Sequence, residues 1–375
     1  MSNELFSDVL GESFPMHSLL STYHSLPPGP HNAITDVAGV RVGHATLIRG
    51  EGALTPGAGP VRTGVTVILP HGGNLFRSKV RAAVHTINGF GKACGFEEVR
   101  ELGVIEAPIA LTNTLNVWRV ADALAGVMVE QNPAIGVNTS SVNVVVGECN
   151  DGYLNDIQGR HVHAEHVLAA LDAAAGGPVA QGNVGAGTGT SCFGWKGGMG
   201  TASRVVSVGN QRWTLGALLQ TNFGRPGELM IAGAPVGRNL RPPDSPPAAS
   251  EIDVEGPERG SVMIVLATDA PLSARQLRRL CVRAGAGLAR TGSRLGHGSG
   301  DFVIAFTTAY RIPHRLDDEE EPLVIQGPIL NDEPRAMHHF FPAVVEAVEE
   351  AVLNSLFAAE TMTGRDGHVR YGLIG

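Results

Sequence analysis

One serine in this 375-residue chain stands where a broken peptide bond would turn it into a nucleophile. Ser261 follows Gly260 and precedes the apolar run 262–268, so we expect it at the mouth of a buried strand. If the Gly260–Ser261 bond breaks, the hydroxyl gains its own α-amino group as a neighbouring base. That amine titrates near pH ~7.7–8.0, so much of it can accept a proton at neutral pH. Because a serine hydroxyl needs such a base, the pair predicts covalent catalysis.

Two clusters elsewhere carry side chains that would serve such a nucleophile. Ser299 and Asp301 lie two residues apart in the glycine-rich stretch 296–301, where they could orient an amine or simply form a turn. The stretch 147–156 contains several carboxylates and amides together with Tyr153, directly after an apolar strand. There a carboxylate could take a substrate ammonium and Tyr153 could donate to an oxyanion. The alternative is a solvated loop with Asx turns.

Two weaker signals complete the set. Asn222 carries a neutral amide donor, the type found in oxyanion holes. The stretch 182–189 superficially suggests a phosphate-binding loop, but it lacks the lysine of GxxxxGK[ST] and the βαβ context. We expect this stretch to line a substrate site or to serve packing.

Composition narrows the classes of partner. The net charge of −8 argues against nucleic acid as the main partner. No apolar run reaches the ~18 residues of a membrane span, and no signal peptide is evident. The four cysteines show no metal-ligand spacing and read as buried reduced thiols. We therefore expect a cytoplasmic protein without a membrane partner.

Strand and helix patterns mix without strict βαβ alternation, which favours a layered α+β fold. The stretch 1–30 reads as an N-terminal arm, and 241–260 as a mobile, proline-rich surface loop. A capping box at Ser273 begins one amphipathic helix. The other predicted helices cover 117–131, 162–175 and 338–359, and the predicted strands 40–45, 65–69, 109–114, 142–146, 203–208, 229–233, 262–268 and 301–308.

Taken together, these motifs resemble the self-processing aminopeptidases of the L-aminopeptidase/D-esterase-amidase (DmpA) and β-peptidyl aminopeptidase family. The resemblance runs from Asn32 to the final helix. It rests on the motifs at 147–156, 182–189, 222, 260–261 and 298–301.

The resemblance implies an αββα four-layer sandwich similar to N-terminal-nucleophile hydrolases but with different connectivity. It implies a single domain over 1–375 made of two chains, an α chain of 1–260 and a β chain of 261–375, after self-cleavage. Family members form homo-oligomers, often tetramers of αβ pairs. No metal or organic cofactor is implied.

The family pattern assigns roles around the new amino terminus. Ser261 is the expected nucleophile, and Ser299 and Asp301 are expected to hydrogen-bond its amine. Relatives often carry glutamate at the acidic position, so Asp301 is one methylene shorter.

The same pattern assigns the substrate contacts. Asn222 and a backbone N–H would form the oxyanion hole, Tyr153 would support it or the leaving group, and Glu148 would hold the substrate's ammonium. The expected reaction releases one N-terminal amino acid from a small peptide, amide or ester through an acyl-enzyme. One alternative is a self-cleaving acyltransferase of the ornithine acetyltransferase type, although its nucleophile is threonine. Another is a non-catalytic glycine-rich assembly protein.

Overall fold

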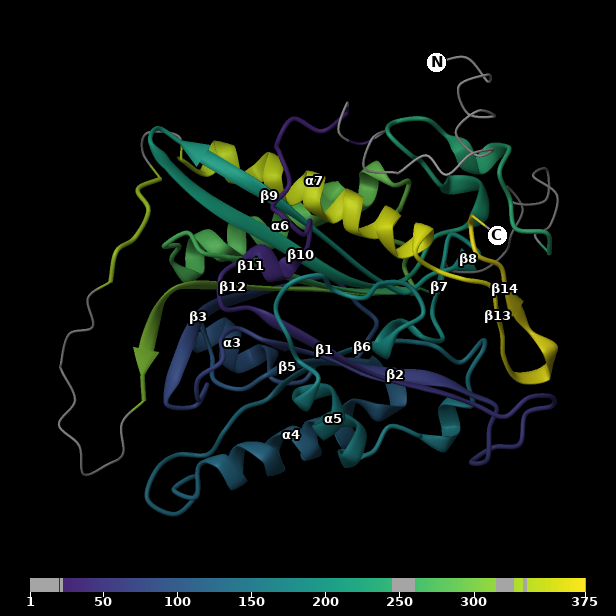
Figure 1. The fold of residues 1–375 in the computed structure, drawn as a ribbon, viewed down its shortest axis with the longest axis horizontal. Coiled ribbons are helices and arrows are strands. Elements are labelled where there is room, and N and C mark those ends of the chain that lie inside the picture. Colours follow the sequence, from purple (N-terminus) through teal and green to yellow (C-terminus); the bar gives the residue numbers. More distant parts are fainter. Residues whose placement is uncertain (1–19, 21–22, 245–259, 315–326, 333–335, 375) are drawn as a thin grey trace.

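Two β-sheets stack face to face, and helices cover the outer face of each (Figure 1). The computed structural model describes residues 20, 23–244, 260–314, 327–332 and 336–374. Within these residues the order of layers is helix, sheet, sheet, helix. The predicted α+β class and αββα sandwich are therefore confirmed.

The larger sheet has six strands. In spatial order they are β4 (Val104–Ile105), β3 (Ser78–Gly89), β12 (Gly300–Pro313), β11 (Ser261–Thr268), β10 (Gln211–Asn222) and β9 (Met199–Val208). At its centre β11 pairs in parallel with β12 and antiparallel with β10. All eight residues of β11 are buried, as expected of a strand covered on both faces. The strand predicted after Gly260 is thus confirmed, and neighbours on both sides fix its backbone.

The smaller sheet has four strands. In spatial order they are β1 (Arg41–Arg49), β2 (Val61–Leu69), β5 (Ile109–Asn113) and β6 (Val145–Cys149). Two short hairpins lie at one end of the sandwich, on the right in Figure 1. They are formed by β7 (Ser191–Cys192) with β8 (Trp195–Lys196), and by β13 (Met362–Thr363) with β14 (Val369–Arg370).

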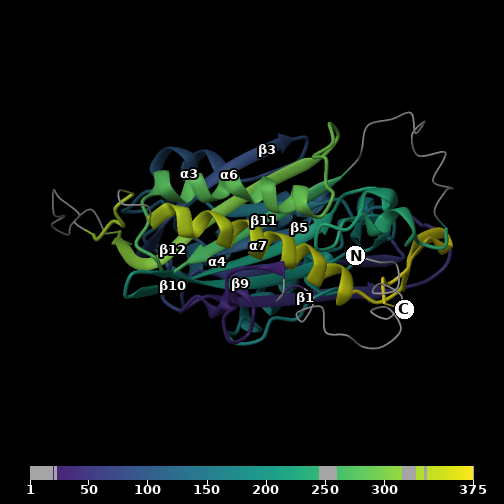
Figure 2. The ribbon, with the colours of Figure 1, turned by 90° about the horizontal axis from the view of Figure 1, so that it is seen from above.

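Helices cover both sheets. α6 (Ala274–Arg290) and α7 (Ala336–Phe357) pack side by side on the six-stranded sheet, as Figure 2 shows from above. α4 (Val117–Gln131) and α5 (Ala164–Asp172) cover the four-stranded sheet, and α3 (Phe96–Leu102) packs against β3 and β4. The capping box at the start of α6 forms as predicted, because the Ser273 side chain accepts from the Gln276 N–H.

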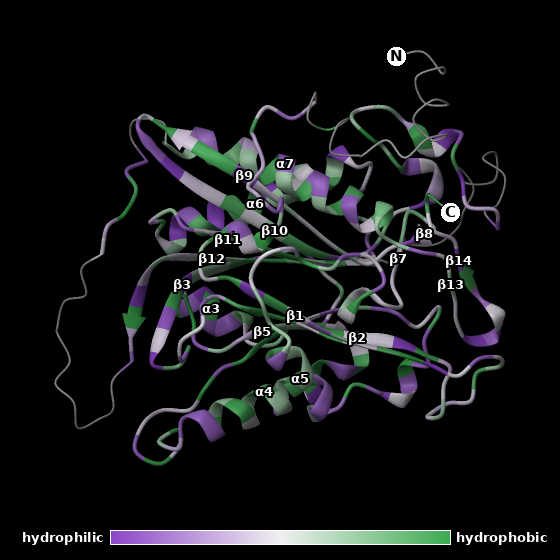
Figure 3. Cartoon of the chain, viewed as in Figure 1, coloured by the Kyte–Doolittle hydropathy of each residue, from purple (hydrophilic) through white to green (hydrophobic). Residues whose placement is uncertain are grey.

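Each pair of facing layers encloses its own apolar core. In Figure 3, α4 carries both hydrophobic and hydrophilic residues, as a helix with one buried side must. Glycines let helices approach strands closely. A Cβ at Gly200 of β9 would lie 1.9 Å from the Ala351 carbonyl oxygen of α7, and one at Gly43 of β1 would lie 1.9 Å from that of Ala170 in α5. The layers could not close to this distance around larger residues.

Some predicted elements differ from the structure. The strand expected at 142–146 begins later, as β6, because the Asn143 N–H is taken by the Glu106 carboxylate. The strand expected at 229–233 is wrong. This stretch turns back on itself through an Ile231–Ala234 bridge, with Ala232 at φ +49°.

The predicted arm and loop are described only in part. Residues 1–19, 21–22 and 245–259 lie outside the described residues. The described end of the arm packs on α7. The Ser25 N–H donates to Glu346 Oε1 at 2.9 Å, and His24 Nε2 lies 3.0 Å from Glu349 Oε2.

Candidate active site

Ser261 is the first residue of β11 and lines a cavity of about 980 Å³. Only 4% of its surface is exposed. Asn222, the last residue of β10, stands directly opposite it on one side, and Gly300, the first of β12, on the other. Three strand ends therefore meet at this serine, and the sheet fixes the position of its backbone.

Two hydrogen-bond donors converge on the Ser261 hydroxyl oxygen. Asn222 Nδ2 and the backbone N–H of Asn150 each donate to Oγ at 3.3 Å. The Ser191 N–H donates to Asn222 Oδ1 at 3.0 Å, which fixes the direction in which the amide nitrogen points. In a tetrahedral adduct on Oγ the oxyanion sits on the carbon bonded to Oγ, within reach of the same donors. Two donors placed in this way can stabilise such an oxyanion.

The carboxylate–hydroxyl pair predicted at 299–301 is formed. Ser299 Oγ donates to Asp301 Oδ1 at 2.6 Å, and Asn88 Nδ2 donates to Asp301 Oδ2 at 3.0 Å. Both members are 1% exposed. Because Ser261 pairs with Gly300, the two side chains flank the residue that lies beside the serine. They therefore lie on β12 beside the start of β11, although neither of them lines the cavity.

The bond before the serine is held as well. The Gly300 N–H donates to the Gly260 carbonyl oxygen at 3.1 Å. A Cβ at Gly260 would lie 3.1 Å from Phe223 Cβ, tighter than ordinary contact. The space at this position therefore favours glycine.

Glu148, on β6, supplies a buried carboxylate to the same cavity. The Lys92 N–H donates to its Oε1 at 2.9 Å, and the Thr114 hydroxyl donates to its Oε2. Within the described part of the chain no side-chain cation forms a salt bridge with it. Burial raises the pKa of Glu148, and the bonds from Thr114 and Lys92 oppose that rise. A cation arriving from the cavity would offset the desolvation cost of the charged carboxylate.

Tyr153 lines the cavity at a more open position, with 37% of its surface exposed. Its ring stacks on His368 at 4.5 Å, and the Arg370 guanidinium carbon lies 3.6 Å from the ring centroid. Its hydroxyl makes no hydrogen bond to another described residue.

Sequence reasoning missed the groups that hold the oxyanion donors. Buried Lys196 donates from Nζ to the carbonyls of Gly187, Thr190 and Gly197, at 3.0, 2.9 and 2.6 Å. Three acceptors match the three N–H groups of an ammonium, although burial lowers the pKa of Lys196. The lysine thereby fixes the loop that presents the Ser191 N–H. No local pattern around a lone lysine signals this role.

The glycine-rich stretch 182–189 serves packing and does not line the cavity. A Cβ at Gly185 would lie 2.3 Å from Thr66 Oγ1, and one at Gly189 would lie 2.9 Å from Asp151 Cβ. Asp151 is buried and accepts from the Thr63 hydroxyl and Asn155 Nδ2, so the residue after Asn150 is anchored too. Buried Lys196 and Asp151 thus help to fix the two segments that supply the donors to Ser261 Oγ.

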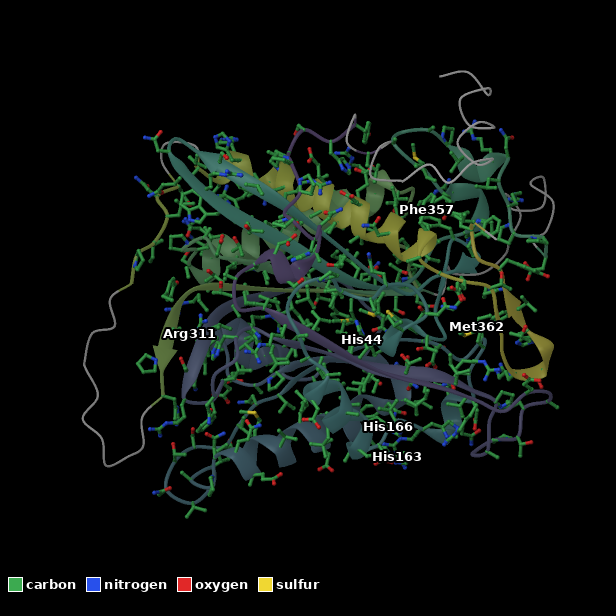
Figure 4. The ribbon with its side chains drawn as sticks, in the orientation of Figure 1. His44, His163, His166, Arg311, Phe357 and Met362 are labelled. Atoms are coloured by element: carbon green, nitrogen blue, oxygen red, sulfur yellow. The ribbon has the colours of Figure 1, made fainter. Side chains whose placement is uncertain are left out.

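Cys149 and three histidines are alternative candidates for catalytic groups. Buried Cys149 donates its thiol to the Gln220 carbonyl, and burial raises its pKa well above the usual range, which disfavours a thiolate nucleophile. His44, His163 and His166, labelled in Figure 4, do not line the cavity. In the described residues no group of three or more potential ligands is placed to hold a metal ion. No helix among them is long and apolar enough to cross a membrane.

Known proteins are similar to this chain over most of its length. The model of peptidase family S58 matches residues 32–370. A β-peptidyl aminopeptidase of Sphingosinicella microcystinivorans is 44% identical over 347 residues, which cover 91% of this chain and 85% of that protein. A solved structure from Pyrococcus horikoshii is 50% identical with a TM-score of 0.84, covering 93% of each chain. The L-aminopeptidase D-Ala-esterase/amidase of Ochrobactrum anthropi, described as a new variant among the Ntn hydrolase fold, is 38% identical with a TM-score of 0.83, covering 98% of this chain and 94% of that one.

Proposed function

This chain belongs to peptidase family S58, and from that premise we propose that Ser261 is the nucleophile of an aminopeptidase that activates itself by cutting the Gly260–Ser261 bond. The family resemblance drawn from the motifs is confirmed, and with it the serine aminopeptidase class. Neither the acyltransferase nor the non-catalytic assembly protein is favoured by these relatives.

Self-cleavage begins with attack of Ser261 Oγ on the carbonyl carbon of Gly260. The C–N bond breaks as the C–O bond forms, and the hydroxyl proton passes to the departing nitrogen, which becomes an amine. Water then hydrolyses the ester and releases a carboxylate on Gly260. The hydrogen bond from the Gly300 N–H to the Gly260 oxygen supports this step, because it stabilises negative charge on that oxygen.

The two products would stay together in one fold. β11 and β12 come from 261–375, yet they lie between β3 and β10, which come from 1–260. Their backbone hydrogen bonds to these neighbours do not depend on the bond at 260. The proposed two-chain domain over 1–375 rests on this interleaving.

In turnover, the substrate's ammonium binds Glu148 and its first carbonyl enters the hole formed by Asn150 and Asn222. Ser261 Oγ attacks the carbonyl carbon, and its proton passes to the Ser261 amine, which Ser299 and Asp301 orient. The amine returns the proton to the leaving nitrogen, and water hydrolyses the acyl-enzyme. A single carboxylate at the ammonium site explains removal of one residue, because an internal amide would leave that buried charge unpaired.

The observation that carries the proposal is the convergence of Asn222 Nδ2 and the Asn150 N–H on Ser261 Oγ, in the cavity that holds Glu148. Ser261→Ala should yield one uncut, inactive chain. Ser261→Thr is the matched control, because it keeps a hydroxyl and should retain some cleavage. Two bands from Ser261→Ala on a denaturing gel would refute the assignment.

The substrate range is tested with a panel of p-nitroanilides. A free N-terminal amine should be required, so N-acetylated versions should not react. Small residues as L-, D- and β-amino acids form the panel, since named relatives act as β-peptidyl aminopeptidases and as an L-aminopeptidase D-Ala-esterase/amidase. We also propose that the protein is cytoplasmic and that it forms a homo-oligomer, a tetramer of αβ pairs. Light scattering on the purified protein measures the mass of this assembly.

A further inference from the structure

We propose that Arg370 binds the free C-terminal carboxylate of the leaving peptide, so that the enzyme prefers short peptide acids over the corresponding amides. This inference rests on the proposed aminopeptidase function. It adds a second charged group to the substrate contacts, besides Glu148. The argument starts from how charge is distributed around Ser261.

Two separate series of contacts lead from the nucleophile to a carboxylate and to a guanidinium. Glu148 and Asn150 belong to one continuous stretch, and the Asn150 N–H reaches Ser261 Oγ. On the other side Asn222 leads to Ser191, whose hydroxyl accepts from Arg370 Nε at 3.1 Å. Glu148 and Arg370 are thus reached from Ser261 through different donors, in a cavity that Lys92, Arg225 and Asp244 also line. A zwitterionic peptide bound with its ammonium at Glu148 directs its carboxylate toward Arg370.

Arg370 is held in place for such a contact. Its Nε is fixed by the Ser191 hydroxyl, and its guanidinium carbon lies 3.6 Å from the centroid of the Tyr153 ring. Its side chain is 19% exposed and lines the cavity. A planar guanidinium fixed on an aromatic face keeps its remaining N–H groups in one plane, which suits a carboxylate.

The remaining N–H groups are not strongly engaged. Nη1 lies 3.5 Å from Asp244 Oδ2, which is long for a hydrogen bond, and donates to the Val369 carbonyl oxygen at 3.3 Å. The Asp244 side chain is 41% exposed, so this ion pair is worth little. Nη2 has no hydrogen-bond partner within the described ranges. At these N–H groups a substrate carboxylate therefore competes with two internal acceptors, the exposed Asp244 carboxylate and the Val369 carbonyl oxygen.

The reach fits a short leaving group. Three hydrogen bonds, through Asn222 and Ser191, separate Ser261 Oγ from Arg370 Nε. Because this path limits how far apart the two groups can lie and an extended residue spans roughly 3.3–3.6 Å, we infer a short leaving group of about one to three residues. The proposed substrate class is therefore di- to tetrapeptides with an unmodified carboxyl terminus.

The test compares each peptide acid with its C-terminal amide. A charge-assisted hydrogen bond contributes enough for the wild-type kcat/KM to favour the acid by roughly 10- to 100-fold. Arg370→Gln should reduce that ratio to about one, and Arg370→Lys should restore part of it. Arg294→Gln is the control, because Arg294 is 77% exposed, lies outside the cavity and should leave the ratio unchanged.

The outcomes separate this proposal from the proposed function. A wild-type ratio near one, or equal losses for acid and amide in Arg370→Gln, overturns the carboxylate site. The second result would assign Arg370 a purely structural role. Hydrolysis by Ser261→Ala instead overturns the proposed function, whatever the ratio.

Discussion

Replacing Asn222 by alanine should separate turnover from self-cleavage, because the two reactions use different oxyanion donors. In turnover, Asn222 Nδ2 is one of two donors at the Ser261 hydroxyl. In self-cleavage, the oxygen that gains charge is that of Gly260, which already accepts from the Gly300 N–H at 3.1 Å. The variant removes the first donor and leaves the second in place.

The expected magnitude follows from the lost contacts. Removing one oxyanion donor costs about 2.7–4 kcal/mol of transition-state stabilisation, a 10²- to 10³-fold drop in kcat. KM should change little, since Glu148 still holds the ammonium. The variant also leaves the Ser191 N–H without its acceptor, which should cost about 1–3 kcal/mol of folding free energy.

The assay measures three quantities on one preparation. Hydrolysis of a p-nitroanilide gives kcat and KM, a denaturing gel gives the cleaved fraction, and urea unfolding gives stability. Asn222→Asp is the matched control, because it keeps an acceptor for Ser191 while placing negative charge beside the oxyanion. It should lose at least as much kcat as Asn222→Ala but less stability. A kcat within tenfold of wild type, or an uncut chain, would refute this reasoning.

Three further variants test other contacts. Glu148→Gln should raise KM more than it lowers kcat. Burial raises the pKa of Glu148 above the ordinary ~4.3, and the substrate's ammonium needs the charged carboxylate, so wild-type kcat/KM should fall as the pH drops through that raised pKa. If the variant kept the same fall in kcat/KM at acidic pH, this role of Glu148 would be contradicted. Gly260→Ala should slow self-cleavage, since its Cβ would crowd Phe223, and a gel time course identical to wild type would contradict this. Arg204→Met should remove the guanidinium that pairs with buried Glu346 and Glu350 and cost about 3–5 kcal/mol in urea unfolding, whereas a loss below about 1 kcal/mol would remove these pairs from the stability argument.

The local signals in the sequence predicted the parts of the fold that they encode. The apolar run after Ser261 is β11, and the capping box at Ser273 begins α6. β3 and β10 were missed because polar residues interrupt their apolar pattern: β3 contains Lys79 and Arg81, and β10 begins with Gln211. Pairing with β12 and β11 stabilises these two strands, although their own sequences lack a clear strand pattern.

The candidate site was predictable only where residue type reveals the role. Asn222 and Ser261 lie 39 residues apart, and their opposition across β10 and β11 follows from strand register. The Asn150 donor is a backbone N–H, which any residue would supply. Arg370 arrives from the far end of the chain through the β13–β14 hairpin. Such contacts depend on the tertiary arrangement and leave no local pattern.

Intact mass and N-terminal sequencing of an active preparation test the central claim most directly. The account predicts two chains, one of 260 residues and one of 115 that begins with Ser261, and activity that rises with the cleaved fraction. A fully active protein consisting of one continuous chain of 39.2 kDa would contradict it.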